Sequence, residues 1–380
     1  MTVLYQLAVL GTPTETQLGE LQACIEQALG RLNLRLGHEV GWELLPAEFK
    51  PYQLHSSAVV FFGGENPDLA NLEELLQRGI PILPVASDLK KVSAEIPEIL
   101  SCLSCMDYSS GGAQHISSAL LACIGLLPHQ RRVFVSYRPD EASEAAAQLF
   151  EALSARDFAV FLDAYDNADD KEAQLLSWQR LYDSDVLLML DTPAYFDSRW
   201  TSVEFGRVLA KGISVLRLGW PDSAASARSA TACNIALFSQ EINPATGIMV
   251  DDALERICLK LEEVRSHNHA VRSVNLASHL RIALETIGAR MLGVGANRAI
   301  HIQLANGKRL LVTPTTGVPA AVALSDALNH SSDQSAVVVY DHLGLGPAWS
   351  KQLEVLETQV PAADWIKFSE ADLQLANWKE

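Results

Sequence analysis

The sequence is poor in positive charge and has no apolar run that we expect to be long enough to span a membrane. Asp and Glu outnumber Lys and Arg by 46 to 29, which gives the 380 residues a net charge of −17. Affinity for nucleic acid depends on Lys and Arg side chains, so we expect no nucleic-acid partner. A membrane-spanning helix needs about 20 predominantly apolar residues in a row, so we expect no membrane partner either.

Cysteine is also scarce. The six cysteines are scattered, and only Cys102 and Cys105 have a spacing that is typical of metal ligands. No second pair of Cys or His accompanies them, so we predict no metal site. Scattered thiols, and a first segment without the basic region of a secretory signal, favour a cytoplasmic protein.

The central part of the chain alternates between predicted strands and helices. Apolar runs at 133–137 and 158–163 predict two strands, and apolar residues at helical spacing in 144–155 predict a helix between them. Apolar runs at 186–190 and 213–216 predict two more strands. This order is typical of an α/β domain with a parallel sheet.

A short polar motif lies between the last two of these strands. Trp200 and Glu204 are four residues apart, a spacing that puts both on one face of a helix. This helix would begin near the carboxyl end of a parallel strand, where open α/β sheets bind their ligands. The spacing therefore predicts a carboxylate that is aimed into a crevice.

The complete pattern, from Phe134-Val-Ser-Tyr137 to Trp200-x-x-x-Glu204, resembles the Toll/interleukin-1 receptor (TIR) domain, most closely its bacterial members. The resemblance covers residues 131–220 and implies a flavodoxin-like domain over residues 131–265. Some TIR domains are scaffolds, and others cleave the nicotinamide–ribose bond of NAD⁺. The resemblance assigns the catalytic glutamate of the second kind to Glu204, with NAD⁺ as substrate and no cofactor.

The chemistry of that bond explains why one carboxylate is enough. Most glycosidases need a second carboxyl group that protonates the leaving oxygen. In NAD⁺ the nicotinamide is already cationic and leaves as a neutral molecule, so no general acid is required. A fixed carboxylate such as Glu204 can then stabilise the positive charge that develops on the ribose.

Further candidate contacts with the dinucleotide lie at the ends of the first two strands of this domain and beside the catalytic position. They are Ser136, Tyr137, Arg138, Asp163 and Trp200. The planar guanidinium of Arg138 suits a pyrophosphate. Alternatively, Ser136 caps the turn and Tyr137 packs in the core.

The loop that follows Asp163 is acidic and departs from the family pattern, because residues 164–170 contain neither Gly nor Pro. The resemblance implies that this loop completes the site of a neighbouring copy, so we expect a homo-oligomer. Asp166, Asp169 and Asp170 would then meet basic residues such as Arg199 or Arg207 of another copy.

The first 125 residues form a predicted Rossmann-like domain, and part of its sequence pattern repeats in the central domain. Gly79-Ile80 and Gly212-Ile213 both open an apolar strand, and counting back from them aligns Glu204 with Asn71 and Trp200 with Pro67. One interpretation is a degenerate TIR-like repeat that lacks the catalytic carboxylate. The other is that any α/β unit has a helix, a glycine and a strand in this order.

The remaining residues, 271–380, form a predicted C-terminal α/β domain that resembles no family. We expect linkers at 109–112 and 266–269, a helix over 276–291, and a glycine-rich helix end at 293–295. Asn306-Gly307 between two apolar runs predicts a β-hairpin. Loops at 313–317 and 341–346 are the predicted place for an activating ligand or protein, with ordinary connections as the alternative.

Two classes of function remain open at this stage. The first is an NAD⁺ glycohydrolase that acts as a bacterial antiviral effector and is activated by assembly or by a ligand. The second is a TIR scaffold or nucleotide-signal sensor without turnover. A nucleoside transferase of related architecture would also use a carboxylate, and it would be indifferent to NAD⁺.

Overall fold

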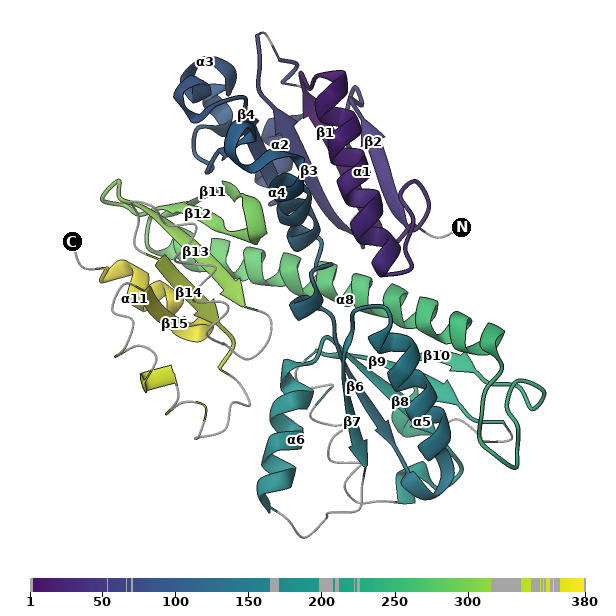
Figure 1. Ribbon diagram of the computed structural model, residues 1–380. Helices are drawn as coiled ribbons and strands as arrows, with labels where there is room; N and C mark the ends of the chain where they lie inside the picture. The colour runs from purple at the N-terminus through teal and green to yellow at the C-terminus, as the bar shows by residue number, and fades with distance from the viewer. Residues whose placement is uncertain are drawn as a thin grey trace. The chain divides into compact units, whose positions relative to one another are not determined.

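The computed structural model shows an α/β protein with three five-stranded sheets (Figure 1). It describes residues 3–378 except 53, 66, 70, 165–170, 198–207, 209–211, 222, 224–225, 316–335, 343–348, 350, 352, 356–357 and 359–362. Contacts divide the chain into two compact units. Unit 1 contains Met1–Leu127 and Ala270–Glu380, and unit 2 contains Pro128–His269.

The first sheet belongs to unit 1 and is parallel throughout, with strand order β2-β1-β3-β4-β5. Its strands are β1 (Tyr5–Gly11), β2 (Val40–Leu44), β3 (Ser56–Phe62), β4 (Ile82–Ala86) and β5 (Met106–Asp107). The accompanying helices are α1 (Glu15–Arg31), α2 (Leu72–Gln77), α3 (Val92–Glu95) and α4 (Tyr108–Cys123). Every residue of β3 is buried, as expected for a central strand with both faces covered.

Helix α4 corrects two expectations. The predicted linker at 109–112 is part of this helix, because the Asp107 side chain caps its first turn and Gly112 absorbs a kink with φ 59°. Residues Tyr108–Gln130 are also long and apolar enough, by length and composition alone, to cross a membrane. In the structure most of this segment is buried, and Ile116, Leu120 and Ile124 pack into the core of the first sheet.

The second sheet belongs to unit 2 and is also parallel, with order β10-β9-β8-β6-β7. Its strands are β6 (Arg132–Tyr137), β7 (Ala159–Ala164), β8 (Val186–Asp191), β9 (Ser214–Gly219) and β10 (Cys233–Ala236). Helices α5 (Pro139–Ser154), α6 (Lys171–Asp183) and the start of α8 (Asp251–Thr286) belong to the same unit. This strand order is the flavodoxin-like one, which confirms the predicted fold.

The two parallel sheets share one strand order, as a repeat would require. Asn71, which aligns with Glu204 in that interpretation, stands just before α2. Its side-chain amide donates to the carbonyl of Phe49 at 2.7 Å and accepts from the Phe49 N–H at 3.3 Å. Asn71 therefore holds the backbone at Phe49 in place. The repeat itself stays a prediction.

Helix α8 corrects the expected linker at 266–269, since the helix continues through these residues. Ser266 and Asn268 are buried. The Ser266 hydroxyl donates to the carbonyl of Glu263 at 2.9 Å, and the Asn268 amide donates to the carbonyl of Asp185 at 2.8 Å. The polar residues 266–269 are typical of a solvent-exposed linker. In the structure, however, the side chains of Ser266 and Asn268 donate hydrogen bonds to carbonyl groups of unit 2.

The third sheet is mixed, with order β11-β12-β13-β14-β15, and lies in unit 1. Its strands are β11 (Arg290–Val294), β12 (Ile300–Gln303), β13 (Arg309–Thr315), β14 (Ala336–Tyr340) and β15 (Ala363–Lys367), followed by α11 (Ala371–Ala376). The predicted hairpin is confirmed, since β12 and β13 pair antiparallel around Gly307 with φ 86°. The predicted helix over 276–291 is wrong at its end, since α8 ends at Thr286. The predicted helix end at 293–295 is also wrong, because Gly293 and Val294 pair with β12.

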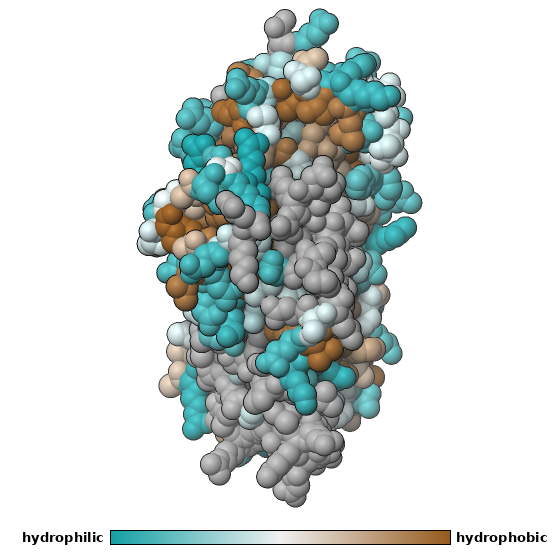
Figure 2. All heavy atoms as spheres, turned by 90° about the vertical axis from the view of Figure 1, so that its left-hand side faces the viewer, coloured by the Kyte–Doolittle hydropathy of each residue, from teal (hydrophilic) through white to brown (hydrophobic). Residues whose placement is uncertain are grey.

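Among the coloured residues of the face that Figure 2 draws, hydrophilic side chains lie around several apolar groups. Scattered apolar side chains are normal on a protein surface, so these groups need no special explanation.

A buried histidine in β12 is expected to make unit 1 sensitive to acid. Burial first, and the charge of Arg309 second, lower the pKa of His301 to about 4 from 6.5. Between these values the unfolded chain binds a proton that the folded chain does not, so stability falls as the pH drops from about 6.5 towards 4. Urea unfolding should show a loss of about 2 kcal/mol between pH 7 and pH 5 from this group.

In His301→Leu that part of the pH dependence should disappear, while replacement of the exposed His115 by Gln should preserve it. An unchanged pH dependence in His301→Leu would show that the residue is not buried in its neutral form.

Candidate functional site

The candidate site lies at the carboxyl ends of the central strands of unit 2. Strand β6 has β7 on one side and β8 on the other, so the chain reverses its direction of winding between β6 and β8. Open parallel sheets form a crevice at such a switch point. The described residues that surround it come from the ends of β6, β8 and β9 and from the segments that follow them.

A pair of hydroxyl groups closes the end of β6. The Ser136 hydroxyl lies 2.7 Å from the phenol oxygen of Tyr195, which belongs to the turn η5 (Tyr195–Asp197) after β8. Both residues are buried, and Ser136 has no exposed surface at all. Ser136 thus joins the end of β6 to the turn after β8. It does not cap α5, since the residue at the N-cap position is Arg138.

Tyr137 and Arg138 have different surroundings: Tyr137 packs in the core, and Arg138 makes polar contacts. Tyr137 is 8% exposed and packs in the core between the sheet and α5, as the packing interpretation predicts. The Arg138 guanidinium donates to the carbonyl of Ala194 at 3.1 Å and lies 3.7 Å from the carboxylate of Glu141. Glu141 in turn accepts a hydrogen bond from the hydroxyl of Thr192. In this conformation Arg138 is engaged with protein groups.

A buried ion pair, which the sequence analysis did not predict, links the next strands. Arg217 of β9 donates from Nε to the carboxylate of Asp191 at 2.5 Å, and from Nη1 to the side-chain carbonyl of Asn234 at 2.7 Å. Its Nη2 is buried and has no hydrogen-bond partner in the described part of the chain. Burial raises the pKa of Asp191, and Arg217 opposes that shift. A signal existed, because an arginine inside an apolar strand needs a buried partner.

Three of these polar side chains share a face of the sheet. Alternation along the strands puts Ser136, Asp191 and Arg217 on the side of Phe134, Met189 and Val215, opposite the side that packs on α5. Asp163 of β7 pairs in register with Ser136. Of the predicted site residues, the structure therefore brings Ser136 and Asp163 to one edge.

The two residues of the predicted helical motif, Trp200 and Glu204, lie outside the described residues, as does the acidic loop after Ala164. Val208 is described, is fully buried, and packs with Phe134 and Met189 on the face just defined. Roles in NAD⁺ binding or cleavage for all six candidates remain predictions.

A cavity of about 480 Å³ lies beside this edge, between the first turn of α5 and the loops after β9 and β10. Asp140, Glu141 and Glu144 contribute carboxylates to its lining, and the lining includes neither Lys nor Arg. Such a cavity is unsuited to a pyrophosphate, because like charges repel.

The structure offers no obvious metal ligands within its described ranges, where no group of three or more His, Cys, Asp or Glu side chains could hold an ion. The thiols of Cys102 and Cys105 contact backbone carbonyl groups. Burial raises the pKa of both thiols, to about 11 for Cys105, so neither is a ready thiolate.

Comparison with known proteins finds a family match within unit 2. Residues 133–243 match the TIR domain family. No curated protein is similar to the chain by sequence.

The solved structures that resemble the chain include two bacterial binding proteins. A fatty acid ABC transporter substrate-binding protein from Thermomonospora curvata is 11% identical, over 85% of this chain and 94% of that chain, with a TM-score of 0.20. The leucine binding protein LivK from Thermotoga maritima is 12% identical, over 82% and 97%, with a TM-score of 0.22. Likeness at this level carries no argument about function.

Proposed function

From the TIR domain at residues 133–243, we propose that this protein is an NAD⁺ nucleosidase that releases nicotinamide. The observation that carries the proposal is the position of Glu204, which completes the Trp200-x-x-x-Glu204 motif inside the matched residues. The products are nicotinamide and ADP-ribose, in its linear or a cyclic form. We further propose a cytoplasmic antiviral effector that is activated by assembly or by a ligand.

The proposed reaction needs one charged group and water. The bond between the ribose carbon and the nicotinamide nitrogen breaks, and its electron pair neutralises the pyridinium. Glu204 stabilises the cation that is left on the ribose. Water then adds to that carbon and loses a proton to solvent, or a hydroxyl or ring nitrogen of the same molecule adds and gives a cyclic product.

The described residues support this proposal. The polar groups Ser136, Asp191 and Arg217 are gathered at a switch point, where a parallel sheet binds ligands. Val208, four residues after Glu204 in the sequence, is buried on the same face of the sheet.

The direct test is to incubate the pure full-length chain with NAD⁺ and to follow nicotinamide by chromatography. Incubation should be repeated with an extract of phage-infected cells, which supplies an activating trigger. Release of nicotinamide that depends on the protein is the expected result. Intact NAD⁺ under both conditions, at high protein concentration, would contradict the proposal.

The acidic loop and the family resemblance predict that activity requires self-association. The rate of nicotinamide release per molecule should therefore rise with protein concentration. It should fall with added salt, because pairing between exposed charges is screened over about 10 Å at 0.1 M ionic strength. A rate that stays proportional to concentration, in a protein that light scattering shows to be monomeric, would contradict this expectation.

A TIR scaffold or nucleotide sensor without turnover is the second candidate. It is favoured by the three carboxylates of the cavity beside the site and by the engagement of Arg138 with Glu141 and Ala194. A scaffold would assemble, and it would leave NAD⁺ intact in the assay above.

A further inference from the structure

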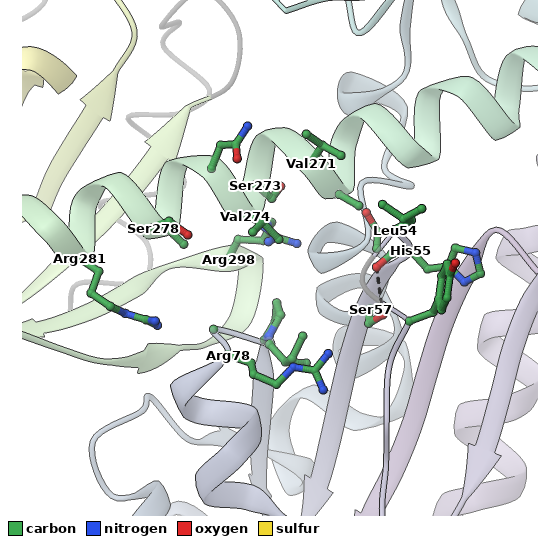
Figure 3. A pocket seen from close by; sticks show the side chains of 18 residues that line it. Leu54, His55, Ser57, Arg78, Val271, Ser273, Val274, Ser278, Arg281 and Arg298 are labelled. Atoms are coloured by element: carbon green, nitrogen blue, oxygen red, sulfur yellow. Dashed lines mark hydrogen bonds between the residues drawn. The ribbon is translucent and has the colours of Figure 1, made fainter. Parts of the chain in front are cut away.

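Unit 1 contains a second cavity, far from the TIR motifs in sequence. Its volume is about 420 Å³, within the range of small-molecule sites. Its walls are the residues before and at the start of β3, the turn between α2 and β4, the part of α8 that belongs to unit 1, and the 3₁₀ turn η7 (Ala296–Arg298) (Figure 3).

The lining of this cavity is cationic in an acidic protein. Arg78, Arg281 and Arg298 contribute side chains from three different elements, as Figure 3 shows. None of the lining residues is Asp or Glu, although the whole chain has a net charge of −17. An arrangement of this kind attracts anions, and the planar guanidinium groups suit phosphate and carboxylate oxygens.

The charges of two of these arginines are not neutralised by neighbours. Arg281 donates to the carbonyl of Gln77 at 2.6 Å, and Arg298 donates to the carbonyl of Cys123 at 2.8 Å. Neither is paired with a carboxylate in the described part of the chain. Burial lowers the pKa of Arg298, which nevertheless keeps its charge because a guanidinium is not deprotonated in proteins.

The third arginine is less available. Arg78 donates to the carbonyl of Pro51 at 2.9 Å and has a long contact of 3.4 Å with the carboxylate of Glu74. Carbonyl groups hold all three guanidinium groups in place, and a held cation loses little freedom when an anion binds.

A buried hydroxyl points to a missing partner in the same cavity. Ser273 is 6% exposed and lines the cavity, yet its hydroxyl has no hydrogen-bond partner in the described residues. A buried polar group without a partner costs about 1–3 kcal/mol, so such groups usually mark an interaction that is formed with something else. A ligand oxygen beside the arginines would supply it.

The rest of the lining suits an uncharged ring. Leu54, Val271 and Val274 provide apolar surface. The rings of Tyr52 and His55 lie with their centroids 5.0 Å apart at the same cavity. A ligand with a phosphate at one end and a flat ring at the other would use both halves.

We propose that unit 1 binds a phosphorylated small molecule of nucleotide size in this cavity, with its anionic groups on Arg281 and Arg298 and a hydrogen bond to Ser273. The proposal does not depend on NAD⁺ cleavage by unit 2. It gives the ligand that was expected outside the TIR domain a chemical class and a place, at the start of β3 and β4. Residues 316–317 and 343–346 of the two predicted ligand loops lie outside the described residues, so a role for those loops stays a prediction.

The test is calorimetric titration of the full chain with AMP, ADP, inorganic phosphate, adenosine and succinate. AMP or ADP should bind, and adenosine, which lacks the phosphate, should not. In Arg281→Gln the dissociation constant of the nucleotide should rise at least tenfold. Arg290→Gln, which changes an exposed arginine of β11 outside the cavity, should bind as the parent does.

Ser273→Ala separates a binding role from a structural one. Its hydroxyl has no partner without ligand, so the melting temperature of the free protein should not fall, while nucleotide binding should weaken several-fold. Four outcomes would overturn the proposal: no binding of any phosphorylated probe, equal binding of adenosine, binding of succinate alone, or unchanged affinity in both Arg281→Gln and Ser273→Ala. The titration measures binding without any turnover of NAD⁺, so failure of the proposed nucleosidase activity would not be mistaken for failure of this site.

Discussion

Replacing Glu204 with Gln is expected to slow nicotinamide release from NAD⁺ by a factor of about 10² or more. Gln has nearly the same shape as Glu and lacks its charge, so this change removes electrostatic stabilisation of the ribose cation and little else. The reaction has no general acid whose loss could complicate the comparison. Initial rates of nicotinamide release at saturating NAD⁺, for parent and variant at one protein concentration, give the ratio directly.

The matched control is Glu151→Gln, which changes an exposed glutamate of α5 and makes the same change in net charge. It should retain the parent rate, and both variants should melt at the parent temperature. A Glu204→Gln rate within a few-fold of the parent would remove the basis for assigning catalysis to this carboxylate.

Replacing Glu262 with Ala is expected to lower the free energy of unfolding of unit 2 by about 3–5 kcal/mol. Glu262 is 3% exposed and lies between two arginines that have no exposed surface. Its carboxylate accepts from both terminal nitrogens of Arg131, at 3.1 and 2.9 Å, and from Arg265 at 2.9 Å. Removing it leaves two buried cations side by side, with the ring of Phe158 beneath Arg131.

Glu263 provides the control, because it is the next residue of α8 and its pair with Lys260 is partly exposed, with 43% and 32% of the two side chains accessible to solvent. Glu263→Ala should cost less than about 1 kcal/mol, as ion pairs in contact with solvent do. Urea unfolding, followed by the fluorescence of the tryptophans, measures both variants. Equal stability of the two variants would mean that the Arg131–Glu262–Arg265 cluster does not need its carboxylate.

The sequence predicts the elements of unit 2 better than the contacts of its site. Strands such as 133–137 and 186–190 are apolar on both faces, which is a local signal that needs no partner to be recognised. The bond between Ser136 and Tyr195 and the pair of Asp191 with Arg217 join residues from different strands and turns. Their geometry depends on the order of the strands, which the sequence pattern does not contain.

Three errors have a common physical cause. Residues 109–112, 266–269 and 293–295 are polar or rich in glycine, and each was predicted as a linker or a helix end. In the structure the first two lie in helices and Gly293 and Val294 lie in a strand, because capping groups, buried acceptors and a sheet partner satisfy their backbone and side chains. The local composition of a segment indicates only that water could solvate it. Whether the segment is a loop, a helix or a strand depends on the groups that it contacts in the folded protein.

The arginine cavity of unit 1 is invisible in the sequence for a similar reason. Arg78 and Arg298 are separated by more than half of the chain, and neither belongs to a recognisable motif. Only the docking of α8 and η7 beside the first sheet within unit 1 brings them to one cavity.

The division of the chain into units also has a consequence for biosynthesis. Unit 2 is one continuous segment, whereas unit 1 is assembled from segments on both sides of it. A ribosome that makes the chain from its amino end therefore delivers all of unit 2 before the second segment of unit 1. Domains fold as units during synthesis, so the TIR domain can fold before the last strands of unit 1 have been synthesised. During that interval the third sheet, whose core includes Ile300, Ile302 and Val312, has not yet been made. Unit 1 is therefore incomplete, and in that state it is most exposed to chaperones and proteases.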